Sequence, residues 1–127
     1  MAHELSIMMP VYNGAKYLAA ALDSVLRQTF SAFELLVMDD GSTDETPAIL
    51  ASYAAKDSRI RVFRRPRQGQ IASRNELLRL ARSDIVACAD ADDICLPDRL
   101  AQQLRPMSQD SRLWVLGTAM ISIDGSG

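Results

Sequence analysis

Short apolar runs alternate with amphipathic stretches along this chain of 127 residues. The amphipathic stretches have apolar residues at helical spacing and therefore predict helices. Ser42 or Asp44 is expected to cap the second of these helices. Alternating strands and helices are typical of a mostly parallel sheet covered on both faces, so the sequence predicts an α/β, Rossmann-like fold with three α/β/α layers. The apolar runs predict buried strands over residues 5–9, 33–38, 60–63, 85–89 and 113–121. The predicted helices cover residues 15–28, from the turn at 41–44 to about 55, 71–82 and 97–107.

Polar residues follow several of the predicted strands. Tyr12 comes after the first strand, Asp39 and Asp40 end the second, and residues 90–93 follow the fourth. The carboxyl ends of parallel strands meet at one edge of a sheet, where ligands of such folds bind, so these loops are expected to converge. Acids that gather there repel one another unless a cation or hydrogen-bond donors offset their charges.

The fourth strand is followed by three carboxylates within four residues. In an extended backbone Asp90 and Asp92 point the same way and Asp93 the other. One or two carboxylates are what Mg²⁺ or Mn²⁺ takes when phosphates complete its shell. The alternative reading is that Asp92 or Asp93 caps the helix beginning near Pro97.

Composition narrows the class of protein. Hydrophobic residues make up 48% and charged residues 24%, as in ordinary globular proteins, and residues 1–127 are expected to form one domain. The net charge of −2 and the few aromatics near the arginines of residues 59–67 disfavour nucleic acid, so these arginines are interpreted as a solvated face. Exposed apolar surface leaves a homodimer open.

The same features bear on location. The two cysteines, Cys88 and Cys95, fit a reduced intracellular protein. A signal peptide and an apolar stretch of about 20 residues are both lacking, so a cytoplasmic location is expected, with peripheral membrane attachment of a longer form left open. His3, the single histidine, is given no role.

Five motifs, in order, resemble the family 2 nucleotide-sugar glycosyltransferases, which have the GT-A fold. A lone Asp-x-Asp is weak evidence, but five motifs in the right order are strong evidence. The resemblance covers nearly the whole chain. It implies inverting sugar transfer from a nucleoside diphosphate donor, usually UDP- or dTDP-linked, with Mg²⁺ or Mn²⁺, to an unknown glycan, lipid or protein acceptor. The motifs are residues 7–13, 24–30, 34–44, 72–75, and 90–93 followed by 97–100.

The resemblance assigns roles on the nucleoside side of the donor. Pro10 and Tyr12 match the loop that packs against the base, where a tyrosine ring offers a stacking face. Asp39 and Asp40 match the residues that accept from the uracil imide N–H and from the ribose. A carboxylate suits that N–H and disfavours cytosine, whose N3 has no proton. Turn formation at Asp39 is the other reading.

The resemblance also assigns roles on the phosphate side. Arg74 matches an arginine near the pyrophosphate, where a guanidinium suits phosphate oxygens. Asp90 and Asp92 match the metal-binding motif. Asp92 is expected to be the direct metal ligand, and Asp90 to face the ribose or a metal-bound water. Asp93 is expected to support them or to start the next helix.

Two departures from the family pattern matter. The family's general base lies past the fifth strand, beyond Gly127, so no catalytic residue is assigned within this chain. The chain is therefore expected to be the N-terminal donor-binding portion, truncated after about the fifth strand, which binds the donor without efficient transfer. Many relatives carry Asn at the position of Arg67, which leaves the contact there, and the nucleotide, open.

Two other classes of α/β protein fit the sequence less well. A phosphate-accepting regulatory domain needs a lysine at a late strand end, whereas the only lysines are Lys16 and Lys56. A nucleotidyltransferase needs a glycine-rich basic loop after the first strand, which residues 10–14 lack. A non-catalytic nucleotide-binding or assembly module remains the alternative.

Overall fold

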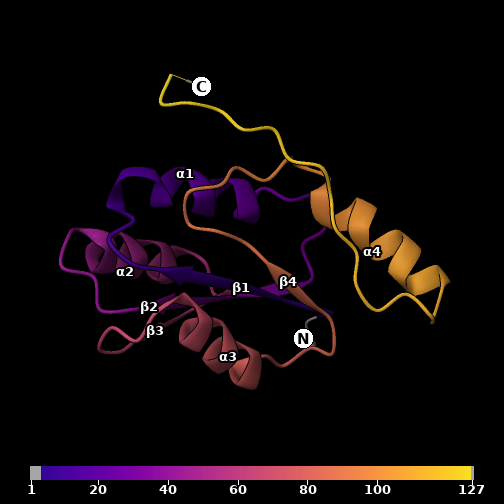
Figure 1. Cartoon of the computed structure of the whole chain (residues 1–127), viewed down its shortest axis with the longest axis horizontal. Coiled ribbons are helices and arrows are strands. Elements are labelled where there is room, and N and C mark those ends of the chain that lie inside the picture. The colour runs from indigo at the N-terminus through magenta and orange to yellow at the C-terminus, as the bar shows by residue number, and fades with distance from the viewer. Residues whose placement is uncertain (1–3, 127) are drawn as a thin grey trace.

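A four-stranded parallel sheet forms the centre of the computed structural model, which describes residues 4–126 (Figure 1). His3 lies outside the described residues. The strands, in the spatial order β3-β2-β1-β4, are β1 (Leu5–Val11), β2 (Phe33–Asp39), β3 (Ile60–Arg64) and β4 (Val86–Cys88). The helices are α1 (Ala15–Leu26), α2 (Thr46–Lys56), α3 (Gln70–Leu80) and α4 (Arg99–Gln109).

Helices cover both faces of the sheet, which confirms the three-layer α/β/α prediction. Alternate residues of β1 and β2 point to opposite faces. Met9 and Val37 pack in the larger core with Leu22 of α1, to which α2 and α4 also contribute. Met8 and Leu36 pack on the other face. Figure 1 shows α3 alone below the sheet, with α1 and α2 above it.

Strand β1 runs two residues further than the sequence predicts, through Pro10 to Val11. The Ser6 N–H donates to the Ile85 carbonyl next to β4, and the Met8 carbonyl accepts from the Ala89 N–H, so the backbone polar groups of the even-numbered β1 residues point toward β4. Since β4 ends at Cys88, the missing N–H of Pro10 falls where no strand needs it. Proline is therefore tolerated in a central strand here, and Tyr12 begins the loop.

The predicted fifth strand is wrong. Residues 113–121 form irregular backbone that leaves the body of the domain after α4 (Figure 1). Trp114 and Ile121 are 87% and 88% exposed. An apolar, β-favouring composition produces a strand only where a neighbouring strand supplies hydrogen bonds, and within residues 4–126 this segment pairs with none.

The predicted cap of α2 is also partly wrong. The helix begins at Thr46, whose N–H donates to Asp44 Oδ1 at 2.9 Å. The hydroxyl of Ser42 instead accepts a hydrogen bond from the Asn13 N–H, in the loop after β1. Among residues 4–126, none of the helices is both long and apolar enough to cross a membrane.

Candidate functional site

The loops that follow β1 and β2 are tied together at the carboxyl edge of the sheet. Asn13 has φ 49°, a left-handed conformation that asparagine tolerates. Its N–H donates to Ser42 Oγ at 2.9 Å, and its side-chain oxygen accepts from the Thr43 N–H at 2.8 Å. The Ala15 N–H, at the start of α1, donates to Asp44 Oδ2 at 3.1 Å. The sequence predicted turns here but not these bonds between the loops, which fix the position of the residue before Asn13, Tyr12.

Two adjoining hollows lie along this edge. The first has a volume of about 240 Å³ and is lined by Pro10, Tyr12 and Asp40, among others. The second has a volume of about 510 Å³; Pro10 and Tyr12 line it too, together with Asp90 and Asp92. The structure thus brings residues from three separate loops to one rim, with the Tyr12 loop between the acids that follow β2 and those that follow β4.

Asp40 is 3% exposed and accepts three hydrogen bonds. They come from Arg65 Nε at 3.1 Å, the Gln68 N–H at 3.0 Å and the Gly69 N–H at 2.7 Å. Burial alone would raise the pKa of Asp40, but these donors outweigh it and the pKa lies below its ordinary value. Asp40 therefore holds the loop after β3 against the rim, a task that sequence reasoning did not assign to it.

Asp39 is 1% exposed but has a different environment. Its Oδ1 accepts from the Ser42 N–H at 2.9 Å, which is the turn role named as the other reading. Its Oδ2 is buried and has no hydrogen-bond donor within residues 4–126. Arg64 Nε lies 3.4 Å from that oxygen as an ion-pair partner. A buried acceptor left without a donor is rare in folded proteins, and Asp39 is not among the residues that line the two hollows.

On the other side of Tyr12, Arg74 of α3 pairs with Asp90, with 2.5 Å between Arg74 Nη2 and Asp90 Oδ1. Asp92 is exposed and, like Asp90, lines the second hollow. Asp93 is exposed, and its N–H donates to the Asp90 carbonyl at 3.3 Å, so residues 90–93 form a turn rather than an extended strand.

A metal site made by protein groups alone is not formed in the described chain. Among residues 4–126, no three acidic, histidine or cysteine side chains come together closely enough to hold an ion. Two carboxylates, those of Asp90 and Asp92, line the second hollow. That number fits Mg²⁺ or Mn²⁺ when a diphosphate supplies further oxygens.

Tyr12, 39% exposed, has an arginine on its ring. The guanidinium carbon of Arg67 lies 3.8 Å from the ring centroid, in the cation–π arrangement. Both residues line the first hollow. The sequence singled out Arg67 as a departure from the family pattern but did not predict this contact.

The interpretation of the arginines of residues 59–67 as a solvated face is only partly right, because Arg64 and Arg67 are exposed but the other three are partly buried. Arg61, for example, reaches the buried Glu34, with 2.7 Å between Nη1 and Oε2. Acids 2 to 27 residues away in the chain take up these charges, which a one-dimensional charge pattern does not reveal. The ion pairs are Arg59–Asp57, Arg61–Glu34, Arg64–Asp39 and Arg65–Asp40.

Comparisons with known proteins agree with the fold and with the motifs. An uncharacterized glycosyltransferase of Haemophilus influenzae is 37% identical over 96% of this chain and 50% of its own length. The chondroitin synthase of Escherichia coli is 33% identical over 97% of this chain and 18% of its own length. The chain thus spans half, or less, of these relatives.

Solved structures are similar as well. S. aureus TarS 1–349 in complex with UDP matches with a TM-score of 0.77 and 30% identity, over 84% of this chain and 32% of that one. The mannosyltransferase PcManGT from Pyrobaculum calidifontis, in complex with GDP-Man and Mn²⁺, matches with a TM-score of 0.77 and 27% identity, over 83% of this chain and 32% of that one. These neighbours are GT-A glycosyltransferases. A profile described as Glycosyl transferase family 2 matches residues 6–127, and the chain belongs to that family.

Proposed function

We propose that this chain is the donor-binding part of an inverting glycosyltransferase that takes a UDP- or dTDP-linked sugar with Mg²⁺ or Mn²⁺. The observation that carries the proposal is the arrangement at the carboxyl edge of the sheet. Asp39, whose Oδ2 lacks a hydrogen-bond donor within residues 4–126, ends β2, the Asp90 and Asp92 carboxylates follow β4, and the Tyr12 loop lies between them. A nucleoside diphosphate has the matching order of base, ribose and phosphates.

The base lies against the Tyr12 ring in this proposal. Base–aromatic stacking contributes about 1–3 kcal/mol per base in single-strand binders, and the same contact is available here. Asp39 Oδ2, which has Arg64 Nε at 3.4 Å but no hydrogen-bond donor within residues 4–126, is proposed to accept the imide N–H of uracil or thymine. Cytosine offers no proton at N3, so the same oxygen disfavours it.

The diphosphate lies over the second hollow. Arg74, which pairs with Asp90 in the free chain, has a guanidinium suited to phosphate oxygens. Asp92 and Asp90 would hold the metal ion, which, when bound, stabilises the charge that develops on the departing diphosphate. Solved neighbours bind UDP, UDP-GlcNAc and GDP-Man, one of them with Mn²⁺, which supports a nucleotide-sugar donor.

The transfer step joins an acceptor hydroxyl oxygen to the anomeric carbon, from the face opposite the leaving group. The bond from that carbon to the phosphate oxygen breaks, and a carboxylate takes the hydroxyl proton. We assign that base to none of the residues of this chain. The chain is therefore proposed to bind the donor without efficient transfer, and robust release of UDP from a UDP-sugar in the presence of simple glycan acceptors would refute that point.

Calorimetry with UDP, dTDP and GDP, each with and without Mn²⁺, tests the proposal. UDP is expected to bind more tightly with Mn²⁺, and Asp92→Asn is expected to weaken that binding about tenfold or more. Asp84→Asn, before β4 at the opposite end of the sheet, serves as the matched control and is expected to bind UDP like the unaltered chain. UDP binding that ignores Mn²⁺ and Asp92 would overturn the donor site.

The alternative, an assembly module, has one observation in its favour. Large apolar side chains of the segment after α4 are exposed, among them Trp114, Met120 and Ile121. Sedimentation of the chain at increasing concentration tests it. Stable self-association without any nucleotide binding would favour assembly over donor binding.

A further inference from the structure

The Arg67–Tyr12 contact differs from the other arginine contacts near it. Arg64 and Arg65 each pair with an acid of the β2 end. Arg67 forms no ion pair with a carboxylate in the described part of the chain, and its charge lies over the Tyr12 ring, 3.8 Å from the centroid. That separation is van der Waals contact, so the guanidinium covers this face of the ring.

The backbone that carries Arg67 is held on two sides. Gly41 has φ +82°, and a Cβ placed on it would lie 2.8 Å from the Arg67 nitrogen, so the two backbones are packed together. The next two residues, Gln68 and Gly69, donate their N–H groups to Asp40 at 3.0 and 2.7 Å. The loop therefore cannot back away from the rim without breaking these bonds, whereas the Arg67 side chain can rotate.

A base does not fit between ring and guanidinium as they stand. Stacked carbon atoms prefer about 3.5–4.0 Å, so a base held between Tyr12 and Arg67 would need a gap of roughly 7 Å. The observed separation is 3.8 Å. Because the loop is fixed, the base gains this face of Tyr12 by displacing the side chain sideways.

We propose that Arg67 occupies the stacking face of Tyr12 in the free protein and has to leave it before a base binds. Arg67 thereby sets how tightly the site holds a nucleoside. This inference rests on the proposed donor site. The contact that is lost is the same for every base, so Arg67 lowers the affinity for all nucleosides alike and leaves the choice between them to Asp39.

The test uses uridine, which carries no phosphate, so that removal of a positive charge does not itself weaken binding. Titrations followed by NMR compare the unaltered chain with Arg67→Asn and Arg67→Ala. Both variants are expected to bind uridine about two- to fivefold more tightly, the factor that corresponds to a typical exposed cation–π contact. Arg79→Ala, on the exposed side of α3, is the charge-matched control and is expected to leave uridine binding unchanged.

A double variant and a spectroscopic readout complete the test. With Tyr12→Leu in place, Arg67→Ala is expected to change uridine affinity no further. In the unaltered free chain the Arg67 side-chain protons are expected to show a ring-current shift that disappears when uridine saturates the site. Weaker or equal uridine binding by the Arg67 variants, or a ring-current shift that persists at saturation, would overturn the displacement. Absence of uridine and UDP binding, or binding indifferent to Tyr12→Leu, would overturn the donor site itself.

Discussion

Two buried carboxylates on one strand, β2, have opposite surroundings. Glu34 near the amino end of the strand is fully buried, and both of its oxygens have donors. Oε1 accepts from Ser6 Oγ at 2.7 Å and from the Arg82 N–H at 2.8 Å, and Oε2 accepts from Arg61 at 2.7 Å. Asp39, at the other end, is equally buried but has a donor on one oxygen only within residues 4–126.

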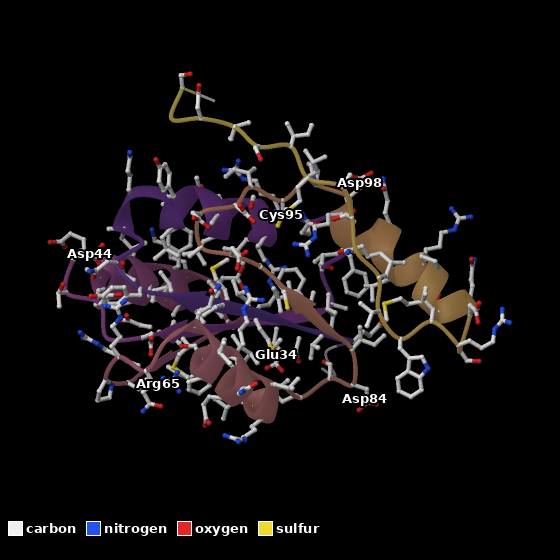
Figure 2. All side chains as sticks on the ribbon, viewed as in Figure 1. Glu34, Asp44, Arg65, Asp84, Cys95 and Asp98 are labelled. Atoms are coloured by element: carbon white, nitrogen blue, oxygen red, sulfur yellow. The ribbon has the colours of Figure 1, made fainter. Side chains whose placement is uncertain are left out.

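We expect Glu34 to serve stability and Asp39 to serve the proposed binding. In Figure 2, Glu34 lies toward the end of the sheet where Asp84 precedes β4, and Arg65 and Asp44 lie toward the other end. At the amino end the chain satisfies its own buried charge and ties the α3–β4 connection to β1 and β2. At the carboxyl end Asp39 Oδ2 has no hydrogen-bond donor within residues 4–126 and has only Arg64 Nε, 3.4 Å away, as an ion-pair partner. An unsatisfied buried acceptor destabilises the free protein and is expected where a ligand completes the site.

The largest effect on stability is expected at Glu34. Glu34→Ala leaves the Ser6 hydroxyl, the Arg82 N–H and the Arg61 guanidinium without their acceptor, so the free energy of unfolding is expected to fall by about 3 kcal/mol. Urea unfolding measures it. Glu76→Ala, which breaks an exposed pair with Arg79 on α3, is the control and is expected to cost about 0.5 kcal/mol or less. A loss below about 1 kcal/mol for Glu34→Ala would contradict the comparison.

The second effect is expected at Gly41, where the carboxyl edge depends on backbone rather than on side-chain charge. Gly41→Ala places a Cβ at φ +82°, 2.8 Å from the Arg67 nitrogen. We expect a loss of about 2 kcal/mol in the free energy of unfolding, together with displacement of the loop after β3. Gly117→Ala is the control, since no described atom lies within 4 Å of the added group. Equal stability of the two variants would show that the loop tolerates the change.

Much of the fold could be predicted from the sequence because its two central strands, β1 and β2, are buried on both faces. All seven residues of β1 and all seven of β2 are buried, so each reads as a mostly apolar run, interrupted by Ser6 in β1 and bounded by Glu34 and Asp39 in β2. The run at 113–121 is also mostly apolar but lacks a strand partner in the described chain. Pairing is a property of the whole sheet, which local composition does not contain.

The sequence predicts which loops meet at the site, because strand order decides this, but not which side chains pair there. Parallel strands bring their carboxyl ends to one edge, so the meeting of Tyr12, Asp40 and Asp92 along one rim follows from the order of elements. The order of elements does not reveal which acid has a carboxylate oxygen without a hydrogen-bond donor. Arg65 lies 25 residues after Asp40 in the chain, and the register of β2 with β3 decides that they pair.

A smaller effect on the free energy of unfolding is expected when the pH is lowered. Burial opposes ionisation of Glu34, but the donors from Ser6, Arg61 and Arg82 outweigh it, so the pKa of Glu34 lies below its ordinary value of 4.5. Its ionised form therefore contributes stability that is complete above pH 4.5 and is lost as the pH falls through the folded-state value. The glutamine side chain of Glu34→Gln does not titrate. The difference in free energy of unfolding between this variant and the unaltered chain is therefore expected to shrink between about pH 5 and pH 3. Urea unfolding across that range measures it, and a constant deficit would contradict the assignment.

The smallest effect on stability, with the clearest effect on binding, is expected at Asp39. Asp39→Asn can keep an oxygen for the Ser42 N–H and loses the 3.4 Å ion pair with Arg64, whose side chain is 59% exposed, so the free energy of unfolding is expected to change by less than about 1 kcal/mol. UDP is expected to bind about tenfold more weakly, because the amide NH₂ meets the imide N–H donor to donor. The affinity for CDP, whose N3 can accept a hydrogen bond from the amide NH₂, is expected to rise relative to that for UDP. Calorimetry with both nucleotides measures the exchange, with Asp110→Asn on the exposed turn after α4 as control. If Asp39→Asn lost as much stability as Glu34→Ala while its UDP affinity stayed constant, Asp39 would be a structural carboxylate like Glu34.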